Sequence, residues 1–234
     1  MDPHAASPRR ETDPRPPMPL TPGRTALVVV DMQNAFLEPE GSCARLGLDH
    51  GALRESLAGV EALVGAARRE RIPIVFTRYA YRPDYGDGGI VIDVLLPGLR
   101  DAGALIDGSW DAELVAELAP RHDEAVIAKN RPSAFHATGL QNHLDALGVD
   151  SLVVCGVTTN VCVESTVRDA MQRDYRVWVV SDAVAEFEAD RHTVALKAMA
   201  WMFASLVDLE SALATLPQLA GPKAADPEKE VHHG

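Results

Sequence analysis

Near-continuous apolar runs alternate with segments of helical period along the middle of the chain, and this alternation restricts the possible folds more than any other feature. Long apolar runs rich in Val and Ile are typical of strands covered on both faces, as in a parallel sheet. The predicted strands are 25–32, 72–81, 124–129, 150–157, 175–184 and 204–209. The predicted helices are 51–72, 111–120, 138–149, 161–175, 189–206 and 210–216. Repeated strand–helix units predict a three-layer, doubly wound α/β fold with a parallel sheet of about six strands.

One domain is expected from the chain length of 234 residues, because single α/β domains commonly reach this size. We place it at residues 24–218. Residues 1–23 are rich in proline and charge and lack the apolar region of a signal peptide, so they are expected to form a disordered leader. Residues 219–234 turn polar and are expected to form a disordered tail.

The charge of the chain excludes two classes of partner. Lys and Arg number 22 against 34 Asp and Glu, which gives a formal net charge of −12. Such a chain repels phosphate backbones and anionic lipid, so neither nucleic acid nor a membrane surface is an expected partner. No apolar run approaches the roughly 18 residues of a membrane span. A small-molecule substrate and a cytoplasmic location are therefore expected.

Three cysteines, at positions 43, 155 and 162, are too few and too widely spaced for a disulfide framework or a cysteine-rich zinc site. Cys155 lies in the middle of a predicted strand and is expected to be buried and inert. Cys43 lies in a loop and is expected to be exposed. Cys162 differs, because it lies where the strand 150–157 gives way to a helical pattern.

Chemically active side chains follow three of the predicted strands. Asp31 ends the first strand, Lys129 ends the strand at 124–129, and Cys162 follows the strand at 150–157. Each has an ordinary alternative, since Asp often caps turns, Lys often extends to the surface and Cys often packs in a core. However, ligands of open α/β sheets bind at the carboxyl ends of the strands, where these three residues would meet.

The predicted position of Cys162 favours a nucleophile. With Thr159 or Asn160 as N-cap, Cys162 falls in the first helical turn, where unpaired N–H groups and the helix dipole stabilise an anion. Helix N-termini and nearby cations lower a thiol pKa from about 8.5 toward ~3.5–7.5, so Lys129 is expected to add to this effect. Asp31 is expected to transfer the proton, and the same N–H groups to hold an oxyanion.

Three segments in this order resemble the isochorismatase-like cysteine hydrolase superfamily, over about residues 24–210: "ALVVVDMQNAFLEPEGS", "AKNRPSAF" and "VVCGVTTNVCVESTVRDAMQRDYRVWVVSDAV". The resemblance implies a catalytic triad of Asp31, Lys129 and Cys162 that hydrolyses C–N bonds of amides and ureido compounds. It also implies a cis peptide at Val157–Thr158, which would aim the N–H groups of Thr158 and Cys162 at the oxyanion. A homo-oligomer, either a dimer or a tetramer, is expected on the same ground.

The branch of the superfamily is indicated by smaller features. Nicotinamidases carry an Asp-x-His metal pair, whereas "TRYAYRPDYGDGGIVID" has no histidine, so neither a metal nor another cofactor is expected. True isochorismatases lack the nucleophilic cysteine. "GSWDAELVAEL" and "NVCVESTVRDA" resemble the ureidoacrylate amidohydrolase branch, which implies ammonia release from a small amide or ureido (carbamoyl) substrate through a thioester. A nicotinamidase-type or isochorismatase-type hydrolase and a non-catalytic interaction module are the alternatives.

Residues that follow strands or lie in loops at the same edge are candidates for substrate contact, although surface or packing roles are equally ordinary. The candidates are Gln33, Asn34, Arg78, Tyr79, Tyr81 and Trp110. An arginine in this region is suited to bind a substrate carboxylate with two hydrogen bonds. The sequence leaves Arg78, Arg82 and Arg131 open for that role.

Overall fold

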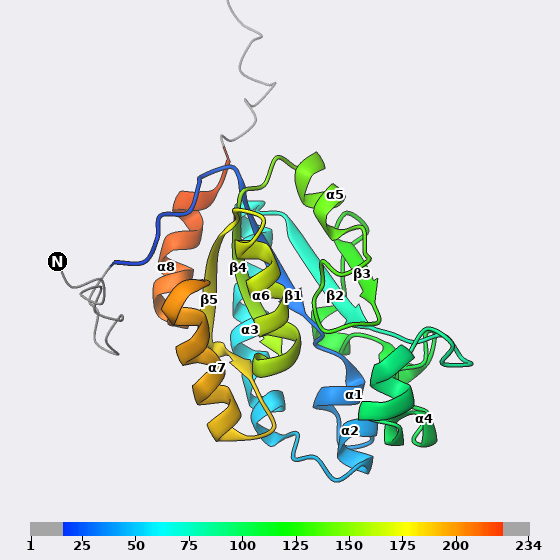
Figure 1. Ribbon diagram of the computed structural model, residues 1–234. Coiled ribbons are helices and arrows are strands. Elements are labelled where there is room, and N and C mark those ends of the chain that lie inside the picture. The colour runs from blue at the N-terminus through cyan, green and yellow to red at the C-terminus, as the bar shows by residue number, and fades with distance from the viewer. Residues whose placement is uncertain (1–15, 222–234) are drawn as a thin grey trace, which may run out of the picture.

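The computed structural model describes residues 16–221 and contains a six-stranded parallel sheet in the order β3-β2-β1-β4-β5-β6 (Figure 1). The strands are β1 (Thr25–Val30), β2 (Ile74–Tyr79), β3 (Ala125–Lys129), β4 (Ser151–Val157), β5 (Arg176–Ala185) and β6 (Ser205–Val207). All six lie within a few residues of the predicted runs. The predicted α/β fold is therefore confirmed.

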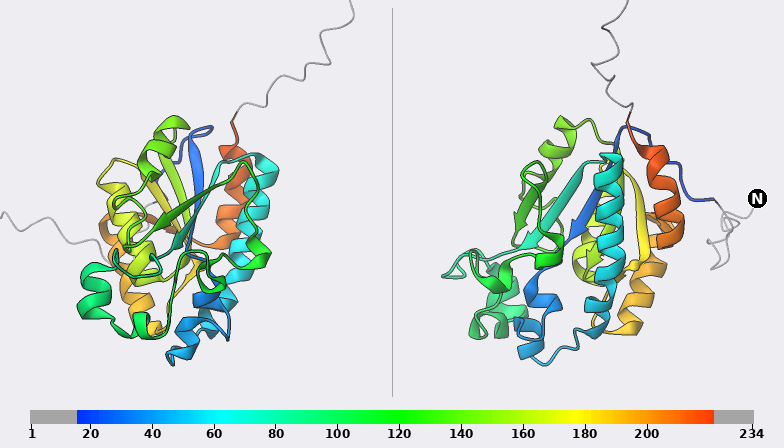
Figure 2. Two further views of the ribbon diagram at one scale, coloured as in Figure 1. Left: turned by 90° about the vertical axis from the view of Figure 1, so that its right-hand side faces the viewer. Right: turned by 180° about the vertical axis from the view of Figure 1, so that it is seen from behind.

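Helices cover both faces of the sheet. The longer ones are α3 (Gly51–Glu70), α5 (Leu140–Ala146), α6 (Glu164–Met171), α7 (Ala189–Met202) and α8 (Leu209–Leu219). Figures 1 and 2 show α3 and α8 on one face, and α5, α6 and α7 on the other. Within residues 16–221, no helix has both the length and the apolar character that a membrane crossing requires.

The strand order creates a switch point between β1 and β4. From β1 the chain moves outward to β2 and β3, then returns to pair β4 with the other side of β1. Ligands of such sheets bind in the crevice beyond the carboxyl ends of the two strands where the direction reverses. Short helices gather at that end of the sheet (Figure 1). They are α1 (Asn34–Leu37), α2 (Ser42–Arg45) and α4 (Gly98–Asp101).

The two central strands form the core and approach each other closely at their carboxyl ends. Every residue of β1 and β4 is buried. Gly156 pairs with Val30 and has a φ of 111°, and a Cβ built there would lie 2.1 Å from the carbonyl oxygen of Val30. Only glycine tolerates both conditions. This close approach brings together the strand ends that precede Asp31 and the turn to Cys162.

The helix predicted at 111–120 is wrong. The structure has two short 3₁₀ turns instead, η2 (Trp110–Ala112) and η3 (Ala116–Leu118). Backbone groups between them are used elsewhere: Val115 N–H donates to the Met32 carbonyl and the Glu113 carbonyl accepts from Asn34 N–H. Since a continuous helix would need those groups, the tertiary contacts override the helical pattern of the sequence.

Part of the predicted leader belongs to the folded domain. Met18 N–H donates to Ser205 Oγ at 2.9 Å, and its carbonyl accepts from Trp178 Nε1 at 2.7 Å. Gly23 N–H donates to the carbonyl of Leu219, the buried last residue of α8. The predicted boundaries at 23 and 219 are therefore corrected to include these residues. The rest of the two predicted disordered segments, residues 1–15 and 222–234, lies outside the described residues.

Candidate active site

Asp31, Lys129 and Cys162 meet at the carboxyl ends of the central strands. Asp31 directly follows β1, Lys129 is the last residue of β3, and Cys162 lies in η4 (Thr159–Val163), a π-helical turn that follows β4. Lys129 Nζ lies 2.6 Å from Asp31 Oδ2 and 3.3 Å from Cys162 Sγ. The fold thus places the three predicted residues in one cluster at the switch point of the sheet.

Asp31 is oriented by the neighbouring strand β2. Its φ of 50° turns the chain sharply after β1. Thr77 Oγ1 donates to Asp31 Oδ1 at 2.6 Å, and Asp31 N–H approaches the Thr77 carbonyl and hydroxyl oxygens at 3.2 Å each. Thr77 is not among the residues predicted for the site. The feature of the sequence that could have indicated Thr77 is its hydroxyl group in an otherwise apolar, buried strand. A buried polar group needs a hydrogen-bond partner.

Lys129 Nζ has three polar partners. Besides Asp31 and Cys162, Nζ donates to the Arg131 carbonyl at 3.3 Å, and it lies 4.2 Å from the centroid of the Tyr79 ring. Burial of this side chain disfavours its charge, but the charges of Asp31 and Cys162 outweigh burial and raise the pKa of Lys129. The side chain is therefore a fixed ammonium ion inside the protein.

Cys162 lies in the first turn of the helical segment that continues as α6, as predicted. The N-cap is Thr158, with extended backbone angles, rather than Thr159 or Asn160. The peptide bond between Val157 and Thr158 is cis, which confirms that prediction. Thr158 and Cys162 thus lie on one tight turn, where the Thr158 carbonyl accepts from Val163 N–H at 3.1 Å.

The predicted low pKa of the nucleophile is wrong. Burial raises the pKa of the Cys162 thiol to about 12, and the charge of Asp31 adds to the rise while Lys129 opposes it. The main reason is burial, which disfavours the charged thiolate more than the Lys129 ammonium, 3.3 Å from the sulfur, favours it. With its pKa raised, the Cys162 thiol is neutral at rest beside the buried ion pair of Asp31 and Lys129.

The turn that carries Cys162 is held from its other side by the end of β5 and by α7. Glu186, only 4% exposed, accepts from Asn160 N–H through Oε2 at 3.2 Å. His192 Nδ1 lies 2.9 Å from the hydroxyl oxygen of Thr159, which is fully buried. Burial lowers the pKa of His192. These contacts fix two consecutive residues of η4 and so restrict the position of the sulfur.

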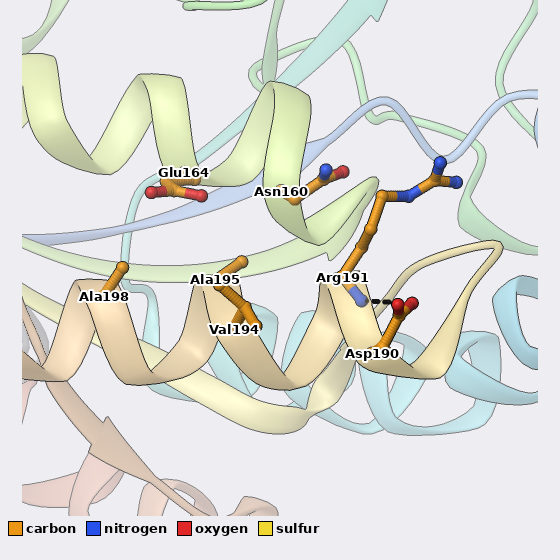
Figure 3. Close-up of a pocket in the computed structure, with 7 residues that line it drawn as sticks. All are labelled: Asn160, Glu164, Asp190, Arg191, Val194, Ala195 and Ala198. Atoms are coloured by element: carbon orange, nitrogen blue, oxygen red, sulfur yellow. Dashed lines mark hydrogen bonds between the residues drawn. The ribbon is translucent and has the colours of Figure 1, made fainter.

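A surface groove runs between α7 and the η4–α6 segment (Figure 3). Asn160 and Glu164 line one side, and Arg191 lies on α7 beside Asp190, whose Oδ1 accepts its N–H at 2.7 Å. None of the groove residues belongs to the cluster of Asp31, Lys129 and Cys162. The groove adjoins the back of the nucleophile turn rather than the reacting sulfur.

Two of the predicted substrate contacts have structural roles, and their contact with substrate remains a prediction. The Gln33 amide donates to the carbonyls of Tyr79 and Ala112 at 2.8 Å each and accepts from Tyr79 N–H at 2.7 Å. Asn34 Nδ2 donates to the Trp110 carbonyl at 2.7 Å. Because these side-chain groups are used by backbone partners, they tie the first loop to β2 and η2.

The other candidates divide into those near the cluster and those away from it. The Tyr79 ring covers Lys129, and the Tyr81 hydroxyl donates to the Tyr79 hydroxyl at 3.0 Å, which places both tyrosines beside the triad. Arg78 forms a 2.7 Å ion pair with Asp107. Trp110 is 52% exposed.

Neither of the remaining cysteines lies beside a buried Asp–Lys ion pair like that of Cys162. Cys155 is fully buried, as predicted, and burial alone raises the pKa of its thiol. Cys43 was expected to be exposed, but it is only 4% exposed in α2, and burial with the Asp111 charge raises its pKa to about 12. All three cysteines are therefore buried, so exposure alone does not single out the nucleophile.

The Cys155→Ala substitution is expected to lower the free energy of unfolding by about 1 kcal/mol, because it leaves a small cavity in a buried strand. Turnover per folded molecule should stay unchanged, since Cys155 contacts the Val28 carbonyl of β1 and no member of the cluster. Urea unfolding and a rate assay of the same preparation measure the two effects. A loss of activity without a loss of stability would contradict this assignment.

No group of three or more His, Cys, Asp or Glu side chains within residues 16–221 is arranged to hold a metal ion. The expectation that catalysis needs no metal remains a prediction, tested below.

Comparison with known proteins identifies the family to which this chain is similar. Residues 25–211 match the isochorismatase domain family. Ureidoacrylate amidohydrolase RutB of Methylobacterium radiotolerans is 36% identical over 212 residues, which cover 84% of this chain and 82% of that protein. Nicotinamidase 3 of Arabidopsis thaliana is 31% identical over 187 residues, which cover 79% of this chain and 85% of that protein.

Solved structures agree with the sequence relatives. A cysteine hydrolase from Pseudomonas syringae pv. phaseolicola superimposes with a TM-score of 0.78 and 32% sequence identity, covering 88% of this chain and 99% of that chain. Because the family match spans nearly the whole described domain and the relatives align over most of their length, the chain belongs to the isochorismatase family of hydrolases.

Proposed function

We propose that the protein is a cysteine-dependent amidohydrolase that cleaves a C–N bond of a small amide or ureido compound. The observation that carries this proposal is the position of Lys129 Nζ, 2.6 Å from Asp31 Oδ2 and 3.3 Å from Cys162 Sγ, at the ligand-binding edge of the sheet. A buried thiol, a carboxylate that accepts its proton and a fixed cation together form the set that nucleophilic acyl transfer requires.

The first step joins the sulfur to the substrate. Cys162 Sγ attacks the carbonyl carbon while its proton moves to Asp31, so the neutral thiol becomes a nucleophile only as the C–S bond forms. The carbonyl oxygen takes the electron pair, and the N–H groups of Thr158 and Cys162 stabilise it. Lys129 keeps its positive charge throughout. It balances the negative charge of the site, which lies on Asp31 at first and on the substrate oxygen once Asp31 is protonated.

The later steps return the site to its starting state. Asp31 gives the proton to the leaving nitrogen, the C–N bond breaks, and a thioester remains, or a thiocarbamate when the substrate is a ureide. Asp31 then takes a proton from water, the hydroxide attacks the same carbon, and the C–S bond breaks as the sulfur regains a proton. A ureide yields a carbamate, which decomposes to ammonia and carbon dioxide.

The relatives support two substrate types within this chemistry. The similarity to ureidoacrylate amidohydrolase favours a ureido substrate. The similarity to nicotinamidase 3 supports a second candidate, a carboxamide, which the same steps would hydrolyse. An isochorismatase-type reaction is less well supported, since cleavage of a vinyl ether has no use for the Cys162 nucleophile.

The test is ammonia release from 3-ureidoacrylate, N-carbamoylsarcosine, biuret and nicotinamide, measured with and without prior alkylation of the protein. We expect release from at least one compound and loss of that release once Cys162 carries the label. Absence of ammonia from every compound, with correctly folded protein, would contradict the proposed function. Release that survives full labelling of Cys162 would contradict the mechanism.

Metal removal is expected to leave the rate unchanged. The chemistry above uses a thiol, a carboxylate and an ammonium ion, and the stretch that would carry the Asp-x-His pair of nicotinamidases has no histidine. Extensive dialysis against EDTA, followed by the ammonia assay in metal-free buffer, measures this. An activity that disappears and returns with zinc or manganese would show that a metal takes part.

A further inference from the structure

We propose that Arg131 binds a carboxylate of the substrate, so that this enzyme acts on amides or ureides that also carry a carboxylate group. The proposal rests on the proposed function, because it places a second substrate group beside the same catalytic cluster. The sequence left three arginines open for such a role, and their surroundings in the structure differ.

Two of the three arginines already have a carboxylate partner. Arg78 Nη1 lies 2.7 Å from Asp107 Oδ1. Arg82 lies 3.2 Å from Asp84 Oδ1, and the side chains of that pair are 61% and 69% exposed. Arg131 is half-buried and forms no ion pair with any Asp or Glu of residues 16–221. A half-buried, uncompensated cation in a chain of net charge −12 suits an anionic ligand.

The guanidinium of Arg131 is fixed by one of its nitrogens and leaves the others available. Nη1 donates to the Asp87 carbonyl at 3.0 Å and to the Asn130 carbonyl at 2.6 Å. Asp87 is itself held, since its carboxylate accepts from Asn130 Nδ2 at 3.1 Å and from Arg82 N–H at 3.0 Å. Neither Nη2 nor Nε of Arg131 has a hydrogen-bond acceptor in the part of the chain that the structure describes. The group is therefore oriented before a ligand arrives.

The two available nitrogens, Nε and Nη2, are the pair that donates two parallel hydrogen bonds to one carboxylate. Arg68 shows this arrangement within the same chain: its Nε and Nη2 donate to the two carboxylate oxygens of Glu124 at 2.8 Å each. Gly89, with a φ of 52°, keeps one side of Arg131 Nη2 clear, because a Cβ at Gly89 would lie 2.5 Å from that atom. Two parallel hydrogen bonds of this kind recognise carboxylates with high geometric specificity.

Arg131 is also close to the reacting groups. Its backbone carbonyl accepts from Lys129 Nζ at 3.3 Å, so the backbone of Arg131 lies directly beside the cluster. Burial raises the pKa of Tyr81, and the hydrogen bond with Tyr79 and the charges of Arg131 and Lys129 oppose that rise. Tyr81 in turn donates to Tyr79, whose ring covers Lys129. The backbone of Arg131 and the two tyrosines thus border the same catalytic cluster.

The experiment compares 3-ureidoacrylate with its neutral methyl ester in the wild type, Arg131→Gln, Arg131→Lys and the matched control Arg82→Gln. The wild type and Arg82→Gln should prefer the carboxylate in kcat/KM. Arg131→Gln should lose about 10- to 100-fold on the carboxylate and change little on the ester, as expected when a charged hydrogen-bond pair is removed. Arg131→Lys keeps the positive charge but loses the two parallel N–H donors, so it should keep part of the preference for the carboxylate over the ester.

Two results would overturn the carboxylate proposal and leave the proposed function intact. The first is an equal loss of kcat/KM on 3-ureidoacrylate and its ester in Arg131→Gln. The second is a wild type that does not prefer 3-ureidoacrylate over the ester. If the wild type releases ammonia from neither compound, binding decides the role of Arg131. The proposed function itself fails only if N-carbamoylsarcosine, biuret and nicotinamide are not hydrolysed either. Calorimetry in a Cys162→Ala background then measures both compounds with Arg131 present or replaced by Gln. Tighter binding of the carboxylate that disappears in Arg131→Gln supports the proposal, and equal binding overturns it. Arg131→Lys serves in both assays if Arg131→Gln does not fold.

Discussion

The Cys162→Ala substitution is expected to reduce ammonia release by at least about four orders of magnitude, because no other group of the cluster can form the covalent intermediate. Removal of a nucleophile leaves only the binding and oxyanion contributions to the rate. The ammonia assay on purified protein, read against the wild type at equal concentration, measures the loss.

The fold should survive this substitution at a small cost. The Cys162 side chain is 4% exposed and packs within the hydrophobic core, so its loss should lower the free energy of unfolding by about 1 kcal/mol. Cys155→Ala is the matched control, since it removes an equally buried sulfur and should spare the rate. Residual turnover above about one part in a thousand in Cys162→Ala, on any substrate of the wild type, would mean that another group is the nucleophile.

The parts of this molecule that a sequence pattern predicts are those set by local alternation of apolar and helical segments. Each strand has its own apolar run, so the positions of Asp31, Lys129 and Cys162 at strand ends follow directly. Strand ends of a parallel sheet share one edge, and this is why residues almost 100 positions apart in the sequence could be placed together. The topology thus explains why the cluster was predictable.

Features set by long-range contacts were not predictable in the same way. The helical pattern of 111–120 is overridden by bonds from Met32 and Asn34, which no local window contains. Gln33 looks like a pocket residue after a strand, yet the backbone of β2 and η2 uses its whole amide. Thr77 gave only a weak signal as a single hydroxyl in an apolar strand.

The charge state of the thiol shows the same limit most clearly. A helix start and a nearby lysine predict a lowered pKa for Cys162. That prediction leaves out the burial of the thiol, which is the largest cause of its raised pKa. Here Asp31 lies closer to Lys129 than the sulfur does, and burial removes water from all three groups. The direction of the pKa shift therefore depends on burial, which only the folded structure supplies.

This arrangement leads to opposite effects of two substitutions in the cluster. Asp31→Asn should reduce turnover by about 10²- to 10⁴-fold, because it removes the group that accepts and returns the proton. It should at the same time lower the pKa of Cys162, since the charge of Asp31 raises that pKa. With Asp31 neutralised, the buried Lys129 ammonium has the thiolate as its remaining anionic partner.

Lys129→Met should also abolish turnover but shift the thiol in the other direction, because it removes the cation that opposes the rise. A thiolate absorbs near 240 nm, so a pH titration of each variant, minus the same variant with Cys162→Ala, reports this one group. The wild type should remain a thiol up to strongly alkaline pH, Asp31→Asn should ionise at lower pH, and Lys129→Met should not ionise earlier than the wild type. Iodoacetamide labelling of Cys162 at fixed pH should follow the same order, since the thiolate is the reactive form. If Asp31→Asn instead leaves the titration unchanged, the carboxylate does not hold the thiol proton at rest, and its role as the base of the first step is wrong.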